Sequence, residues 1–215
     1  MRNHLLRLAE SATSKRPPWR YLMAACAVLI PILVGVAAAP LAMNRFSGEE
    51  VVVPALRIDG HFTLMTPDGS TVTDQSFRGK WLVIYFGYTF CPDLCPTALS
   101  DITVALEQLG PMADKVQPLF ITVDPERDTP QVIADYVGSF DRRLIGLRGT
   151  PEQTAAVAAA YHVYYALRKL GYNGEYVVDH SSFIYVINPQ GQFVTLLTAD
   201  LPGHPIADAL RQLIR

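Results

Sequence analysis

An apolar run that leads directly into a pair of cysteines constrains the fold more than any other feature of the chain. Residues 81–88 read WLVIYFGY, as expected of a central strand that is covered on both faces. Cys91 and Cys95 follow within a few residues, and a helical pattern begins at Pro96. The apolar side of this predicted helix consists of Ala98, Ile102, Ala105, Leu106 and Leu109. A buried strand that feeds into an amphipathic helix is typical of an α/β domain.

The rest of the domain continues this alternation. A β-hairpin is expected at residues 61–74, and Thr129 and Thr150 each predict a helix start, with threonine as N-cap and proline at the first helical position. Further strands are expected at residues 116–123, 144–147, 183–188 and 192–198, and helices at residues 96–109, 130–140, 151–161 and 205–214. This order predicts a thioredoxin-like domain, a central mixed sheet flanked by helices, at residues 55–215.

A long apolar stretch precedes this domain. Residues 21–43 contain no charged residue and are long enough to cross a bilayer as a transmembrane helix. Basic residues lie just before the stretch, so residues 1–20 are expected to be a cytoplasmic tail and residues 44–54 a linker on the far side. Two alternatives stay open: a cleaved signal peptide with small residues at 37–39, and a lipoprotein signal ending at Cys26.

Composition excludes several classes of function. The 215 residues carry a formal net charge of -2, which gives no electrostatic reason to bind nucleic acid. The chain has 3 cysteines, which are too few for a disulfide scaffold and lack the spacing of a four-ligand zinc site. Because Cys26 lies in the apolar stretch, Cys91 and Cys95 are the two cysteines of the predicted domain.

These two cysteines and a distant histidine form a candidate metal site. Cys91 and Cys95 stand where a strand gives way to a helix, and the helix N-terminus stabilises thiolate. Their spacing places both sulfurs on one face of a helical turn, where they can clamp a metal ion or form a disulfide. The segment at His180 precedes the strand at residues 183–188 and can reach the same rim of the sheet. Asp179 is expected either to orient the imidazole or to cap a turn.

The chemistry of this donor set favours copper. Two thiolates and one imidazole are soft ligands that suit Cu(I), and an added oxygen or nitrogen ligand would suit Cu(II). A closed structural zinc site needs a fourth protein ligand, and none has suitable spacing. A purely structural disulfide between Cys91 and Cys95 remains the alternative for an exported domain.

Three motifs together resemble those of a known family. They are GYTFCPDLCP at residues 87–96, TVDPERDTP at residues 122–130 and DHSS at residues 179–182. With the anchor, the chain from Val53 onward resembles the Sco/SenC copper chaperones of cytochrome c oxidase assembly. The first motif lies at the predicted cysteine turn, whereas the second is expected to be a strand-exit turn with a helix cap.

The resemblance implies a function, a partner and a location. It implies that Cys91, Cys95 and His180 bind one copper ion, as Cu(I) or Cu(II). The protein would deliver copper to the copper-containing subunit of cytochrome c oxidase, or reduce the cysteines of that subunit beforehand. Another periplasmic copper chaperone or a thiol reductase would be a further partner. We expect a single-pass protein of the bacterial inner membrane with its C-terminal domain in the periplasm.

Two redox enzymes are the alternatives. In a membrane-anchored thiol-disulfide oxidoreductase, Cys91 would attack and Cys95 would resolve the mixed disulfide. Three residues separate the cysteines, where the usual redox motif has two, and His180 has no obvious task in that chemistry. A thiol peroxidase is disfavoured because Tyr88 stands where that chemistry uses a threonine. No residue is assigned as catalytic beyond this conditional pair.

Overall fold

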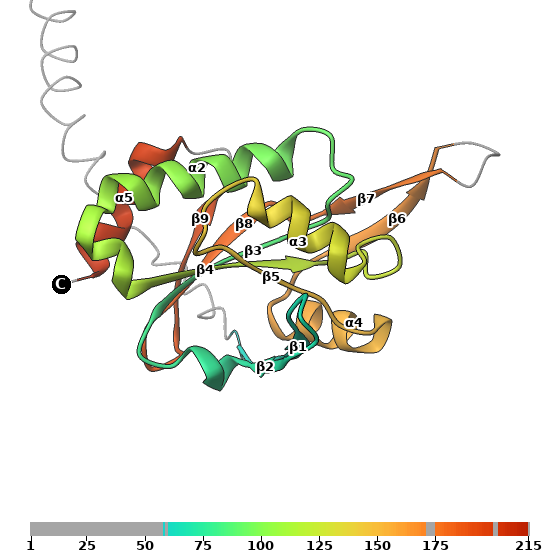
Figure 1. Ribbon diagram of the computed structural model, residues 1–215, viewed down its shortest axis with the longest axis horizontal. Helices are drawn as coiled ribbons and strands as arrows, with labels where there is room; N and C mark the ends of the chain where they lie inside the picture. The colour runs from blue at the N-terminus through green and yellow to red at the C-terminus, as the bar shows by residue number, and fades with distance from the viewer. Residues whose placement is uncertain (1–57, 59, 171–174, 200–201, 215) are drawn as a thin grey trace, which may run out of the picture. The chain divides into compact units, whose positions relative to one another are not determined.

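A five-stranded mixed sheet forms the centre of the computed structural model, which describes residues 58, 60–170, 175–199 and 202–214 (Figure 1). The strand order is β5-β4-β3-β8-β9. The strands are β3 (Trp81–Gly87), β4 (Val116–Thr122), β5 (Ile145–Leu147), β8 (Phe183–Ile187) and β9 (Phe193–Thr198). β3 pairs parallel to β4 and antiparallel to β8, and β4 pairs parallel to β5. The strand predicted from the apolar run is therefore the central one.

Helices cover both faces of this sheet. The helices α2 (Leu94–Leu109), α3 (Pro130–Gly138) and α5 (Gly203–Leu213) lie on one face (Figure 1). α4 (Pro151–Ala160) lies on the other with the antiparallel hairpin of β1 (Thr63–Met65) and β2 (Thr71–Thr73). The chain steps from β3 to β4 to β5 in one direction, so two right-handed crossovers place α2 and α3 on the same face. The short 3-10 helices η1 (Asp74–Phe77) and η2 (Gly110–Lys115) precede β3 and β4.

Successive side chains of β3 point to opposite faces of the sheet, so the strand contributes to the core on both faces. Phe86 packs against Tyr161 and Tyr185, with ring centroids 5.3 Å and 5.4 Å away, on the face covered by α4. The side chain of Tyr85 faces the opposite way, toward α2 and the cysteines. All five positions predicted for the apolar side of α2 are buried. The central sheet therefore holds one core layer on each face.

The predicted helix starts at the two Thr-Pro sequences are confirmed. The side chain of Thr129 accepts a hydrogen bond from the backbone N–H of Val132, and Thr150 forms a capping box with Gln153. The start of α2 differs from the prediction, because the helix begins at Leu94 rather than at Pro96. The backbone N–H and the side-chain hydroxyl of Thr97 both donate to the carbonyl of Asp93, which places Cys95 within the first turn.

One hairpin was not predicted from the sequence. The strands β6 (Tyr165–Lys169) and β7 (Tyr176–His180) pair antiparallel and extend from the end of the sheet (Figure 1). His180 is therefore the last residue of a strand rather than part of a loop. Asn173-Gly174, a pair typical of tight hairpin turns, was the sequence signal that could have revealed this element.

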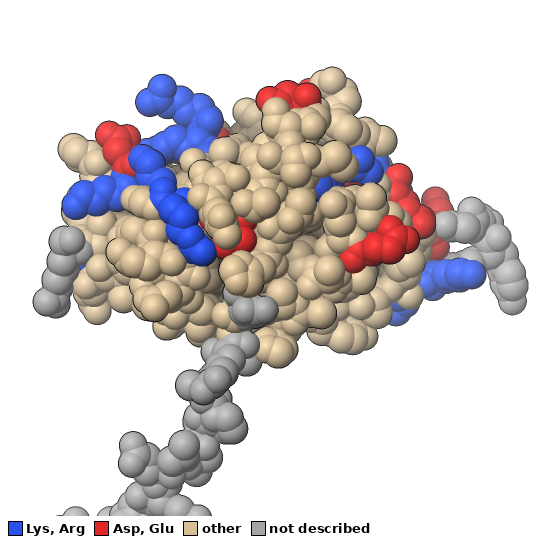
Figure 2. All heavy atoms as spheres, turned by 90° about the horizontal axis from the view of Figure 1, so that it is seen from below, with Lys and Arg blue, Asp and Glu red and all other residues tan. Residues whose placement is uncertain are grey.

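The membrane and linker predictions fall outside the described residues. The expected tail, anchor and linker at residues 1–20, 21–43 and 44–54 all precede the first described residue. Among the residues that the structure describes, none belongs to a helix with the length and apolar character needed to span a bilayer. Acidic and basic side chains are mixed on the face seen in Figure 2, so this face presents no single-sign patch for nucleic acid.

Candidate metal site

The two cysteines lie on the turn between β3 and α2. Cys91 is half-buried and closes a turn through its backbone N–H, which donates to the carbonyl of Tyr88 over 3.2 Å. Cys95 is fully buried in the first turn of α2, and its backbone N–H donates to the sulfur of Cys91 over 3.4 Å. Both cysteines are free rather than joined in a disulfide. The turn thus presents one sulfur toward solvent and one toward the core.

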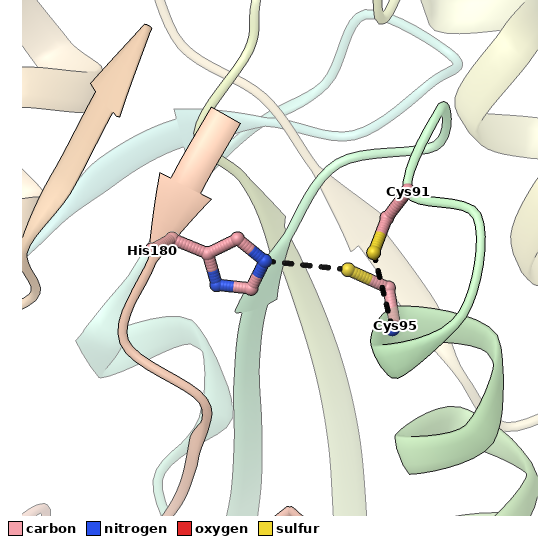
Figure 3. A group of neighbouring side chains, drawn as sticks. All are labelled: Cys91, Cys95 and His180. Carbon is pink, nitrogen blue, oxygen red and sulfur yellow. Dashed lines mark hydrogen bonds between the residues drawn. The ribbon is translucent and has the colours of Figure 1, made fainter. Parts of the chain in front are cut away.

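His180 brings a nitrogen ligand to the two sulfurs. Its Nε2 atom lies 3.4 Å from Sγ of Cys95, and the ligand atoms of Cys91, Cys95 and His180 all lie within 4.8 Å of one another (Figure 3). The Nδ1 atom lies 3.0 Å from the carbonyl oxygen of Ser181, which can only accept a hydrogen bond. Nδ1 must therefore carry the proton, and the lone pair of neutral His180 is on Nε2, facing the cysteines.

Of the two alternatives predicted for Asp179, the one in which it orients the imidazole is wrong. Its carboxylate accepts two hydrogen bonds from Arg168, over 2.9 Å and 3.2 Å, and both side chains are exposed. Asp179 and His180 are neighbours in a strand, so their side chains point to opposite sides of it. The carbonyl of Ser181 performs the orienting role instead.

Two tyrosines form the aromatic surroundings of the imidazole. The rings of Tyr85 and Tyr88 meet the ring of His180 edge to face, with centroids 6.2 Å and 5.9 Å away. Both tyrosines are buried. A cleft of about 380 Å³ opens beside Cys91 and His180. Its other lining residues include Asp93, Arg168 and Asp179, so the site has a polar entrance.

Hydrogen bonding between the two thiols gives them different acidities. Hydrogen bonding with Cys95 lowers the pKa of Cys91 by more than burial raises it. The pKa of Cys95 is raised, first by its hydrogen bond with Cys91 and second by burial. Cys91 therefore ionises before Cys95 and is the more nucleophilic of the two.

The second motif ties the cysteine turn to the sheet. Asp128 is fully buried, and its carboxylate accepts hydrogen bonds from the backbone and hydroxyl of Thr89 and from the hydroxyl of Thr122. Thr89 stands two residues before Cys91. The expected strand-exit turn and helix cap are present, and Thr129 provides the cap. Through Asp128, the motif also holds the cysteine turn against the end of β4.

Arg127 links this motif to the strand that carries His180. Its guanidinium carbon lies 3.7 Å from the ring centroid of Tyr176, at the start of β7. Its Nε donates to the buried carboxylate of Asp124 over 2.5 Å, and its Nη1 donates to the carbonyl of Tyr176 over 2.8 Å. Arg127 and Tyr88 belong to the motifs quoted above, but their contacts, like those of Tyr85, were not predicted, because no local pattern in the sequence indicates contacts across the fold.

The donor set fits a single soft metal ion. Two ligand atoms bound at about 2.3 Å to one ion lie at most about 4.6 Å apart, so the observed spacing needs only a small closure. Two sulfurs and one imidazole nitrogen suit Cu(I). Among the described residues, this is the one cluster of three or more metal-binding side chains, and it includes no fourth ligand of the kind that a closed zinc site requires.

Comparison with known proteins identifies the family. A family model described as SCO1/SenC matches residues 53–215. The chain belongs to the SCO1/SenC family. The mitochondrial SCO2 homolog of Bos taurus is 42% identical over 155 residues, which cover 71% of this chain and 58% of the relative. This chain spans about half the length of the curated relatives that it matches.

Solved structures of family members share the fold. Arabidopsis thaliana ScoI, solved with copper bound, is 39% identical, with a TM-score of 0.69 over 74% of this chain and 98% of that one. Bradyrhizobium japonicum ScoI, also solved with copper bound, is 41% identical, with a TM-score of 0.66 over 71% of this chain and 96% of that one. The predicted thioredoxin-like α/β fold is therefore confirmed.

Proposed function

We propose that this protein binds one copper ion through Cys91, Cys95 and His180 and delivers it to the copper-containing subunit of cytochrome c oxidase during assembly. The convergence of the three ligand atoms within 4.8 Å of one another carries the proposal. The copper-bound ScoI structures support copper as the ion, and the family resemblance supports the oxidase as the recipient.

The difference between the two cysteines suits transfer of an ion. Cys91 is half-buried at the cleft, whereas Cys95 is buried behind it. A ligand from the recipient can enter the cleft and displace the sulfur of Cys91 first. Cys95 and His180 would hold the ion until a second incoming ligand binds. Binding requires loss of the thiol protons, so copper uptake should release protons and weaken in acid.

Anaerobic titration of the reduced protein with Cu(I), beside a competing chelator, tests the proposal. We expect one-to-one binding that weakens by more than about 100-fold in Cys91→Ser and in His180→Ala, because loss of a ligand should exceed the effect of outer partners. His61→Ala is the matched control, since this exposed histidine lies in a separate cleft beside Asp74. Copper affinity that ignores His180 would refute the three-ligand site.

A second candidate is thiol-disulfide exchange, and the lowered pKa of Cys91 favours it. The Cys91 thiolate would attack a disulfide of the recipient, and Cys95 would release the reduced recipient while a Cys91–Cys95 disulfide forms. A separate thiol reductase would then have to return two electrons to this pair. His180→Ala separates the two functions, because it should weaken copper binding strongly and leave exchange with a model disulfide nearly unchanged.

We also propose that residues 21–43 anchor the domain to the bacterial inner membrane, with residues 1–20 in the cytoplasm and the domain at residues 55–215 in the periplasm. The uncharged apolar stretch and the basic residues before it support this orientation. Resistance of the full chain to alkaline extraction, with cleavage by protease added to spheroplasts, is the expected result. Release of the protein by alkali would contradict the anchor.

A further inference from the structure

The hydroxyl of Tyr85 is a buried polar group beside the metal site. Tyr85 is fully buried in β3, and its hydroxyl makes no hydrogen bond with any part of the chain that the structure describes. A buried hydroxyl without a partner is unfavourable, and such groups are uncommon in folded proteins. This unused donor therefore needs a physical explanation.

The polar neighbours of this hydroxyl belong to the site. The ring of Tyr85 meets the ring of His180 edge to face. Burial raises the pKa of Tyr85, so its side chain is a neutral phenol with a proton to donate. A Cβ atom placed on Gly87 would lie 2.9 Å from Sγ of Cys95 and 3.0 Å from Cε1 of Tyr85, so the ring of Tyr85 borders this buried sulfur.

The state of the Cys95 sulfur decides whether it can use this donor. A neutral thiol sulfur is a weak acceptor, whereas a thiolate accepts strongly. Metal binding removes the proton of Cys95 and creates that acceptor next to Tyr85.

We propose that the Tyr85 hydroxyl donates a hydrogen bond to the Cys95 sulfur when this cysteine binds copper as a thiolate. The inference rests on the proposed copper site and adds a residue that adjusts the ligand without touching the metal. A hydrogen bond to a metal-bound sulfur draws electron density away from the metal and sets its redox potential. Tyr85 is thus a positioning residue that weakens the preference of the site for Cu(II).

The spectrum of the Cu(II) protein tests this hydrogen bond in Tyr85→Phe. Without the donor, the sulfur orbitals rise in energy, so the sulfur-to-copper charge-transfer band should move to longer wavelength. The ratio of Cu(II) to Cu(I) affinity should rise by about tenfold, which equals about 59 mV for a one-electron couple. The melting temperature should stay equal or rise, because the variant removes an unpartnered buried hydroxyl.

Tyr185→Phe is the matched control, since Tyr185 is equally buried in β8 but packs against Phe86 and Tyr161 on the opposite face of the sheet. Its band should coincide with that of the unchanged protein. If the band of Tyr85→Phe coincided with that of the unchanged protein, or if Tyr185→Phe shifted the band by the same amount as Tyr85→Phe, this inference would be overturned and the proposed copper site would stand. A wild-type protein without any sulfur-to-copper band would overturn the proposed copper site and this inference with it.

Discussion

The Nε2 atom of His180 lies 3.4 Å from the Sγ atom of Cys95, although the two residues are 85 positions apart in the chain. Cys95 is fixed in the first turn of α2, whereas His180 ends β7, a strand outside the central sheet. The geometry of the site therefore depends on how the β6–β7 hairpin is held against the cysteine turn.

Reduced Cys91 should be alkylated at unusually low pH. The hydrogen bond from Cys95 holds the pKa of Cys91 below its usual range, whereas the pKa of Cys95 is raised. With iodoacetamide at about pH 6, we expect modification of Cys91 and protection of buried Cys95, because the thiolate is the nucleophile. Mass spectrometry of digested protein after a pH series measures both rates.

The control for this experiment is Cys95→Ala, which removes the thiol that donates to Cys91. In this variant the pH dependence of Cys91 alkylation should move up toward that of a free cysteine, about pH 8.5. Reaction of Cys95 before Cys91, or the same pH profile in both proteins, would contradict the assignment of Cys91 as the thiolate.

Local patterns in the sequence predicted most of the fold, because many of its elements have one clear apolar face. The apolar side of α2 and the unbroken apolar run of β3 each determine burial without knowledge of the rest of the chain. The β6–β7 hairpin escaped prediction for the opposite reason. Three successive residues of β6, Leu167 to Lys169, are exposed, so its sequence lacks the alternation that marks a half-buried strand.

The three candidate ligands were predicted, but their surroundings were not. Cys91, Cys95 and His180 are visible in the sequence because few residue types bind soft metals. The orienting acceptor of His180 is a backbone carbonyl, which any residue at position 181 would provide. Tyr85 lies in a strand that is apolar on both faces, so alternation alone does not indicate which face meets the cysteines.

Arg127→Ala should destabilise the protein and weaken copper binding together. The change leaves the carboxylate of Asp124 buried without its cation and removes the contact with Tyr176 at the start of β7. We expect a loss of about 3 kcal/mol in the free energy of unfolding. Cu(I) affinity should fall by about tenfold, as for other residues that support a metal ligand from outside. Urea unfolding and chelator competition measure the two effects.

Arg168→Ala provides the comparison, because it removes an arginine from an exposed ion pair with Asp179 on the same hairpin. Exposed pairs are screened by solvent, so urea unfolding should show no measurable change. Arg127→Lys should lie between wild type and Arg127→Ala, since lysine keeps the charge but loses the planar stack. Equal stability of Arg127→Ala and Arg168→Ala would show that the Arg127 link does not hold the hairpin.

Gly87→Ala should disturb Cys95 directly. Gly87 ends β3, and a Cβ atom placed there would lie 2.9 Å from Sγ of Cys95 and 3.1 Å from Cε2 of Phe120. Both neighbours are fully buried and cannot move outward, so the added methyl group must displace the sulfur or the backbone. We expect a loss of about 1–3 kcal/mol in the free energy of unfolding and a fall of about tenfold in Cu(I) affinity.

Gly138→Ala makes the same substitution where there is room for it. Gly138 is the last residue of α3, and an added Cβ meets no atom within 4 Å. Alanine restricts the unfolded chain and favours helix, so this variant should gain about 0.4–1 kcal/mol and keep its copper affinity. A Gly87→Ala protein that binds copper as tightly as Gly138→Ala would mean that the position of the Cys95 sulfur does not limit binding.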